Sequence, residues 1–212
     1  MHAIILVDND VLLKLARYDL LDAYRDLVAS EFRNYQFYVL STAKFKLMPR
    51  NDRLKYCGNG VVADRLEYFI ASASVVNEAL VDLDILEVLN AIPGIDTGEA
   101  LLISAVIRSE SAFLMSGDKK AVAALSHDDV LPYTAALDCK IYIMEEVVRG
   151  LISLNFKVVQ ISIRSSPSVD SAMSNVFGRA HPTDQDGVKA GLASYIQHAQ
   201  RFIEIKLGRF GC

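Results

Sequence analysis

Acidic side chains stand next to the apolar segments of this chain at three places. Asp8 ends the first apolar run, Glu99 lies in an Ile-Asp-Thr-Gly-Glu-Ala segment, and Asp118 lies in a Met-Ser-Gly-Asp-Lys-Lys segment. Carboxylates that share a site raise one another's pKa, and a divalent cation held by oxygen ligands relieves this repulsion. These acids are therefore candidate catalytic residues and ligands of Mg²⁺ or Mn²⁺, with Asp10 and Asp96 as further candidate ligands.

The chemistry that suits such a cluster is hydrolysis of a phosphodiester bond. A bound Mg²⁺ or Mn²⁺ lowers the pKa of a water ligand, orients this water in line with the scissile phosphate and neutralises charge on the leaving oxygen. A Ser, Cys or His nucleophile is not needed for this reaction. The acids predict a metal-dependent hydrolase, on the condition that they meet in the folded chain.

Short apolar runs predict the elements that would bring the acids together. Four runs have the character of buried parallel strands and are followed by helical patterns, at 3–7, 37–40, 112–115 and 141–144. This alternation predicts a three-layer α/β/α domain with a mostly parallel sheet. If the first and third runs are neighbours, Asp8 and Asp118 lie at the same sheet edge, and a helix that starts near Thr97 places Glu99 there too.

The chain is expected to form one α/β domain with two helical additions. The domain covers residues 1–150 and contains a helical insertion at about 44–80. Residues 151–212 are expected to form a mainly helical extension packed on the same domain, with a last helix over about 184–207.

Composition excludes several classes of protein. With 52% hydrophobic residues and a net charge of -4, the chain lacks the signature of disorder. Its three Cys residues are far apart, unlike those of a disulfide scaffold or a zinc site. We expect a cytoplasmic protein, because the chain shows neither a signal peptide nor an apolar run long enough to span a bilayer.

Each acid also has a purely structural interpretation. Asp96 and Glu99 have the spacing of a capping box at the start of a helix. Asp118 and Asp10 could each cap the helix that follows. None of these roles needs a metal ion, so the argument for a site depends on the acids acting together.

Taken together, the motifs resemble those of the PIN-domain nucleases. The matching segments are an apolar strand followed by Asp8, Asn9 and Asp10, then Ile-Asp-Thr-Gly-Glu-Ala-Leu-Leu-Ile-Ser-Ala at 95–105, then Phe-Leu-Met-Ser-Gly-Asp-Lys-Lys-Ala at 113–121. The resemblance covers about residues 1–145. It implies a metal-dependent ribonuclease that cuts mainly single-stranded RNA, and many members are toxins of toxin-antitoxin pairs.

The resemblance also implies roles for individual residues. Asp8, Glu99 and Asp118 match the family's acidic metal ligands, and Ser116 and Asn9 match supporting positions beside them. The chain departs from the family after the second strand, where a Glu is usual and Ser-Thr-Ala-Lys-Phe-Lys-Leu stands at 41–47. Either Asp10 or Asp96 compensates, or the chain is a catalytically inactive PIN-like module that binds RNA or protein.

A basic segment after the second strand is a candidate RNA-binding surface. It contains Phe45 and Tyr56 among five basic residues, and a further lysine follows Asp118; the candidate contacts are Lys44, Lys46, Arg50, Arg53, Lys55 and Lys119. Cations neutralise phosphates while aromatic rings stack on unpaired bases. The alternative is a solvated helical face.

A haloacid-dehalogenase-like phosphatase is a further alternative. In that family the first Asp of an Asp-x-Asp pair is a nucleophile and the second a general acid, as Asp8 and Asp10 could be. The interpretation needs another acid shortly after Asp118, and Lys119 and Lys120 stand there instead. The sequence leaves open which RNA is bound and whether an antitoxin, another protein or a second copy of the chain is a partner.

Overall fold

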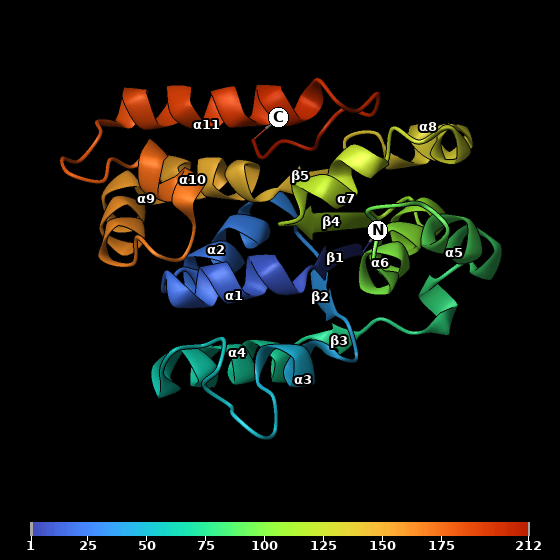
Figure 1. Cartoon of the computed structure of the whole chain (residues 1–212), viewed down its shortest axis with the longest axis horizontal. Helices are drawn as coiled ribbons and strands as arrows, with labels where there is room; N and C mark the ends of the chain where they lie inside the picture. The colour runs from blue at the N-terminus through green and yellow to red at the C-terminus, as the bar shows by residue number, and fades with distance from the viewer. Residues whose placement is uncertain (1, 212) are drawn as a thin grey trace.

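The fold is built around a parallel β-sheet with helices on both faces (Figure 1). The computed structural model describes residues 2–211, and within them the strand order is β3-β2-β1-β4-β5 with every neighbouring pair parallel. The strands are Ala3–Val7 (β1), Tyr35–Val39 (β2), Ser74–Val75 (β3), Ala112–Ser116 (β4) and Ile141–Ile143 (β5). The predicted three-layer α/β/α fold with a parallel sheet is confirmed.

Helices connect the strands and continue the chain after β5. The α-helices are Asn9–Arg17 (α1), Leu21–Glu31 (α2), Ala43–Leu47 (α3), Gly60–Ser72 (α4), Leu83–Asn90 (α5), Thr97–Arg108 (α6), Lys119–Ala124 (α7), Thr134–Leu137 (α8), Met144–Ser165 (α9), Ser171–Val176 (α10) and Gln185–Gln200 (α11). Short 3₁₀ helices span Glu78–Leu80 (η1) and Asp128–Tyr133 (η2). Within residues 2–211, no helix combines the length and apolar character needed to cross a membrane.

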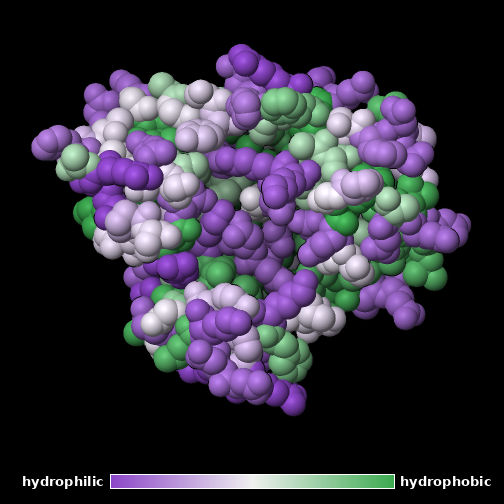
Figure 2. Space-filling view, viewed as in Figure 1, coloured by the Kyte–Doolittle hydropathy of each residue, from purple (hydrophilic) through white to green (hydrophobic). Residues whose placement is uncertain are grey.

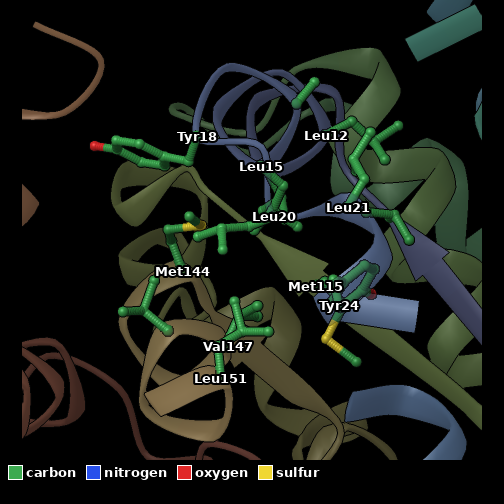
Figure 3. Close-up of a cluster of buried hydrophobic side chains, with 14 of the residues drawn as sticks. Leu12, Leu15, Tyr18, Leu20, Leu21, Tyr24, Met115, Met144, Val147 and Leu151 are labelled. Carbon is green, nitrogen blue, oxygen red and sulfur yellow. The ribbon is translucent and has the colours of Figure 1, made fainter. Parts of the chain in front are cut away.

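The two faces of the sheet bury different sets of side chains. Because side chains alternate along a strand, β1 turns Ile5 and Val7 to one face and Leu6 to the other. The first face is covered by α1, α2, α4 and α9, and Figure 3 shows part of this core, where Leu15, Met115 and Val147 come from α1, β4 and α9. The second face is covered mainly by α5, α6, α7 and α8.

The register of the sheet places the acidic motifs at one edge. Val7 pairs with Met115, so β1 and β4 end level with each other. The backbone N–H of Asp8 donates to the carbonyl of Met115 over 3.0 Å, which extends this pairing by one residue. Asp118 follows two residues after the end of β4, and α6 begins at the same edge. The predicted pairing of the first and third apolar runs is therefore correct.

Two predicted helical segments differ in the structure. The segment 44–80 includes β3, which pairs with β2 at the edge of the sheet, so it is not helical throughout. The last helix ends at Gln200 instead of continuing to 207. Beyond it, Ile203, Ile205 and Leu207 are buried while the residues between them are exposed. This alternation is typical of an extended segment.

The tail after α11 is extended because it is bonded to the start of β5. The N–H of Cys139 donates to the carbonyl of Lys206 over 2.8 Å, and the N–H of Gly208 donates to Ile141 over the same distance. The expected division at residue 150 falls inside α9, which leads from β5 into the extension and is kinked at Asn155, where the backbone is not helical. Leu192 of α11 is fully buried in the same core as Ile5 of β1.

A candidate active site at the carboxyl edge of the sheet

A cleft of about 670 Å³ opens at the carboxyl edge of the sheet, and the acids that the sequence singled out line it. Figure 2 shows a hollow with hydrophilic side chains in the middle of this face of the molecule. The cleft is lined by six carboxylates and four lysines, namely Asp8, Asp10, Asp96, Glu99, Asp118 and Asp170 with Lys14, Lys46, Lys119 and Lys120. The strand ends and the start of α6 have thus brought together residues more than a hundred positions apart.

Asp8 lines the cleft and follows directly after β1. It occupies the N-cap position of α1, but its carboxylate makes no capping hydrogen bond. Burial raises its pKa to about 6, repulsion by Asp10 adds to this, and backbone N–H groups of Gly117 and Asn9 act in the opposite direction. A partly buried carboxylate with a raised pKa in a cleft is typical of functional sites.

Glu99 combines a capping role with strong electrostatic coupling. Its Oε2 accepts the backbone N–H of Asp96 over 2.6 Å, while Asp96 Oδ1 accepts the N–H of Glu99 over 2.8 Å, so the predicted capping box is present. Burial raises the pKa of Glu99 to about 7; the backbone N–H of Asp96 opposes this rise, while the charges of Asp96, Asp118 and Asp8 add to it. Asp96, Asp118 and Asp8 are thus close enough to Glu99 to affect its ionisation.

Asp118 also uses one carboxylate oxygen as a cap. Its Oδ1 accepts the N–H groups of Lys120 and Ala121 over 2.6 and 3.1 Å at the start of α7. The buried hydroxyl of Ser116 accepts the backbone N–H of Asp118 over 3.3 Å, which fits its predicted supporting place. Because each cap engages one oxygen, the second oxygen of Glu99 and of Asp118 remains a candidate ligand.

Asp10 is held by a lysine that the sequence analysis did not select. Lys14 Nζ lies 2.7 Å from Asp10 Oδ2 and 2.8 Å from Asp170 Oδ2. Burial acts to lower the pKa of Lys14, but the bonds to both acids outweigh it and the pKa is raised. A Cβ on Gly117 would lie 2.1 Å from Asp10 Oδ2, so this glycine is needed for the close approach.

These contacts change the roles of several predicted residues. Asp10 does not cap α1 and is engaged in an ion pair, which makes it a poorer candidate ligand than Asp8. Its spacing of four residues from Lys14 on a helix was a signal for that pair. No local signal pointed to Asp170, which arrives from the loop before α10. Asn9 lines the cleft, and its buried Oδ1 has no hydrogen-bond partner within the part of the chain that the structure describes.

The donor set suits Mg²⁺ or Mn²⁺ better than a softer ion. Among residues 2–211, no group of three or more His, Cys, Asp and Glu side chains is close enough as arranged to enclose an ion. Mg²⁺ does not need such a cage, because it keeps several waters and takes one or two carboxylates together with substrate phosphates. One or two of Asp8, Glu99 and Asp118 could supply the carboxylates for such an ion.

The predicted basic surface divides into paired and available cations. Lys44 Nζ lies 2.7 Å from Glu67, and Arg53 lies 2.7 Å from Asp64 and 2.8 Å from Glu67, so α4 neutralises both. These pairs make Lys44 and Arg53 poor candidates for contact with phosphate. The sequence did not reveal them because the acids belong to a different helix.

The other cations of this segment accompany exposed aromatic rings. Arg50 lies over the ring of Phe45, 5.1 Å from its centre, and Lys55 lies 5.0 Å from the centre of Tyr56. Phe45 is 51% exposed. Lys119 instead forms an ion pair with Glu145 and contacts the ring of Tyr195, so it ties α7 to the extension.

Comparisons with known proteins assign the chain to no family. A scan against protein-family models and searches of curated proteins and of solved structures find no match. The geometry of the cleft and the motifs that line it are therefore the basis for assigning a function.

Proposed function

We propose that this protein is a metal-dependent, PIN-like endoribonuclease that hydrolyses phosphodiester bonds in single-stranded RNA. The observation that carries the proposal is the cleft at the carboxyl edge, which Asp8, Glu99 and Asp118 line together, and in which burial and the charges of the other acids raise the pKa of Glu99. Carboxylates gathered in this way gain most from a divalent cation. Structural ion pairing does not explain Asp8, since its side chain neither caps a helix nor faces a lysine within salt-bridge distance among residues 2–211.

The proposed reaction consumes one water molecule for each bond cut. A bound Mg²⁺ or Mn²⁺ would supply a water of lowered pKa and would offset charge on the phosphate. Hydrolysis would add the oxygen of one water molecule to phosphorus and break the bond from phosphorus to the leaving sugar oxygen, which would end as a hydroxyl group by taking up the proton that the water loses. Asp8, Glu99 and Asp118 would hold the ion, and the backbone around Ser116 and Gly117 would keep Asp118 in place.

Single-stranded RNA is the substrate class that the surroundings of the cleft favour. The segment 45–56 offers two exposed aromatic rings, each accompanied by a cation, in the same region of the chain as the cleft residue Lys46. Rings of this kind stack on unpaired bases without strong sequence preference. A role as a toxin, and an antitoxin or second copy of the chain as partner, remain predictions from the resemblance.

A catalytically inactive RNA-binding module is the second candidate. The observation that favours it is the short helix α3, which carries lysines and no acid where it approaches the cleft. A haloacid-dehalogenase-like phosphatase is less well supported, because Asp10 is bound to Lys14 and is not free to act as a general acid.

Metal-dependent cleavage is the direct test of the proposal. We expect the purified protein to bind Mn²⁺ in a calorimetric titration and to cut a labelled single-stranded RNA of about 20 nucleotides. A chelator should stop the cleavage and excess Mg²⁺ should restore it. An Asp118→Asn sample purified in parallel controls for contaminating nuclease. Protein that binds this RNA but neither binds Mn²⁺ nor cuts would contradict the enzyme and favour the binding module.

The aromatic and cationic side chains before α4 should contribute to RNA affinity. Phe45→Ala is expected to weaken binding of a single-stranded RNA about tenfold, because stacking on one base contributes about 1–3 kcal/mol. Arg50→Ala should weaken binding by less. It should also reduce the slope of log affinity against log salt concentration by about 1, the value for one lost phosphate contact. Fluorescence anisotropy at several salt concentrations measures both effects. Arg53→Ala is the matched comparison, since Arg53 is already paired; equal effects at 50 and 53 would contradict the assignment.

A further inference from the structure

The four lysines of the cleft differ in what already neutralises them. Lys14 is bound to both Asp10 and Asp170. Lys119 is bound to Glu145, which is only 2% exposed, and stacks against Tyr195. Both ammonium groups are therefore committed to the protein. The two cleft lysines without such an anchor, among the residues that the structure describes, are Lys46 and Lys120.

Of these two, Lys46 is the one in contact with the acid cluster. Its Nζ lies 3.9 Å from Asp96 Oδ2, and the two side chains are 53% and 62% exposed. An ion pair between such exposed groups is weak and screened by solvent, so the ammonium can exchange Asp96 for another anion. Lys46 reaches this place because α3 follows β2 at the carboxyl edge of the sheet.

Gly98, at the start of α6, lies beside Lys46. Gly98 has no side chain, and a Cβ there would lie 2.9 Å from Leu40 Cδ1, 3.1 Å from Asp96 Oδ1 and 3.8 Å from Lys46 Nζ. A larger residue would push against Leu40 and the capping carboxylate. The backbone of α6 and the lysine therefore line adjacent parts of the same cleft wall.

The excess of negative charge in the cleft suggests a function for Lys46. Lys14 offsets one of the two charges of Asp10 and Asp170, and four further carboxylates line the cleft, namely Asp8, Asp96, Glu99 and Asp118. An approaching phosphodiester adds a further negative charge, and this charge grows in the transition state of hydrolysis. A single divalent ion does not offset all of it. A free cation at the rim would offset a further part of it.

We propose that Lys46 is a catalytic residue of the ribonuclease, whose ammonium binds a non-bridging oxygen of the scissile phosphate and replaces a second metal ion. The proposal rests on the proposed function. Lys46 acts only as a cation and transfers no proton. The bonds that form and break in the hydrolysis are therefore the same with or without it. Cleavage should then depend on one divalent ion for each active site.

Removal of this charge should affect catalysis and metal binding in opposite directions. Lys46→Met keeps the aliphatic chain, and we expect kcat to fall about 100-fold with little change in KM, as when one preorganised charge is removed from a transition state. Calorimetry on the metal-free protein should show Mn²⁺ binding a few-fold more tightly, since a competing cation is gone. Lys46→Arg should recover much of the activity. The wild-type rate should rise with Mn²⁺ concentration with a Hill coefficient near one.

The control is Lys157→Met, which removes an exposed lysine of α9 outside the cleft lining. If wild-type protein neither binds Mn²⁺ nor cuts RNA, the proposed function itself is wrong and this inference falls with it. If wild-type protein cuts RNA, three results would each overturn the role of Lys46 alone. These are equal activity of Lys46→Met and Lys157→Met, weaker Mn²⁺ binding by Lys46→Met, or a wild-type rate that rises with the square of the Mn²⁺ concentration.

Discussion

Replacement of Asp8 by Asn is expected to abolish RNA cleavage and, at the same time, to stabilise the metal-free protein. The loss of activity should be at least about 100-fold, because even the outer partners of metal ligands typically account for 10–100-fold. The gain in stability follows from burial, which raises the pKa of Asp8 from 3.8 to about 6. At pH 7.5 the folded protein must keep this carboxylate ionised, and an Asn removes that penalty.

The sign of the pH dependence follows from the raised pKa. A carboxyl group with a higher pKa in the folded state favours folding below pH 3.8, and this contribution is lost as the pH rises through about 6. One pKa unit corresponds to about 1.4 kcal/mol, so a rise from 3.8 to about 6 means that the ionised Asp8 should lower the free energy of unfolding by on the order of 3 kcal/mol at neutral pH. The decrease in the free energy of unfolding that the ionisation of Asp8 causes between pH 4 and 6 should be absent in Asp8→Asn.

Urea unfolding of the metal-free proteins over this pH range measures the effect. Asp118→Asn is the matched variant: it should lose activity to a similar extent without a gain in stability, because Asp118 caps α7 and an Asn caps nearly as well. A destabilised Asp8→Asn protein would show that Asp8 has a structural role. Full activity in both variants would remove the cleft from the proposed reaction.

Replacement of Leu192 by Ala should destabilise the whole domain by about 2–5 kcal/mol. Leu192 lies on α11 and is fully buried in the core that also contains Ile5 of the first strand. Truncation of a side chain in such a core loses the burial of its methyl groups and leaves a cavity. Because the extension shares its core with the sheet, we expect a single unfolding transition at lower denaturant concentration.

Circular dichroism and near-UV signals during urea unfolding should report the same midpoint for the Leu192→Ala protein. The control is Gln197→Ala, an exposed position on the same helix, which should change stability by less than about 0.5 kcal/mol. Two separate transitions, with only the first one shifted, would show that residues 151–211 unfold independently of the sheet.

Local sequence patterns determined the framework of the site. The apolar runs at 3–7 and 112–115 give β1 and β4 because an unbroken β-branched and apolar run suits a strand buried on both faces. The capping box of Asp96 and Glu99 depends on residues three apart and is visible in the sequence for that reason. Once the sheet is parallel, the acids at these strand and helix ends have to meet at one edge.

Tertiary structure alone decided which charges are free within that framework. Lys44 and Lys46 stand two residues apart on α3, yet one is paired with Glu67 and the other lies in the cleft. Asp170 reaches Lys14 from a loop more than 150 positions away. The tail after Gln200 is extended because β5 supplies its hydrogen-bond partners. Sequence by itself determined which acids and cations stand at the ends of strands and helices, because these elements follow from local periodicity. Which of these charges are ionised and free to bind depends on contacts between distant segments, and only the tertiary structure decided this.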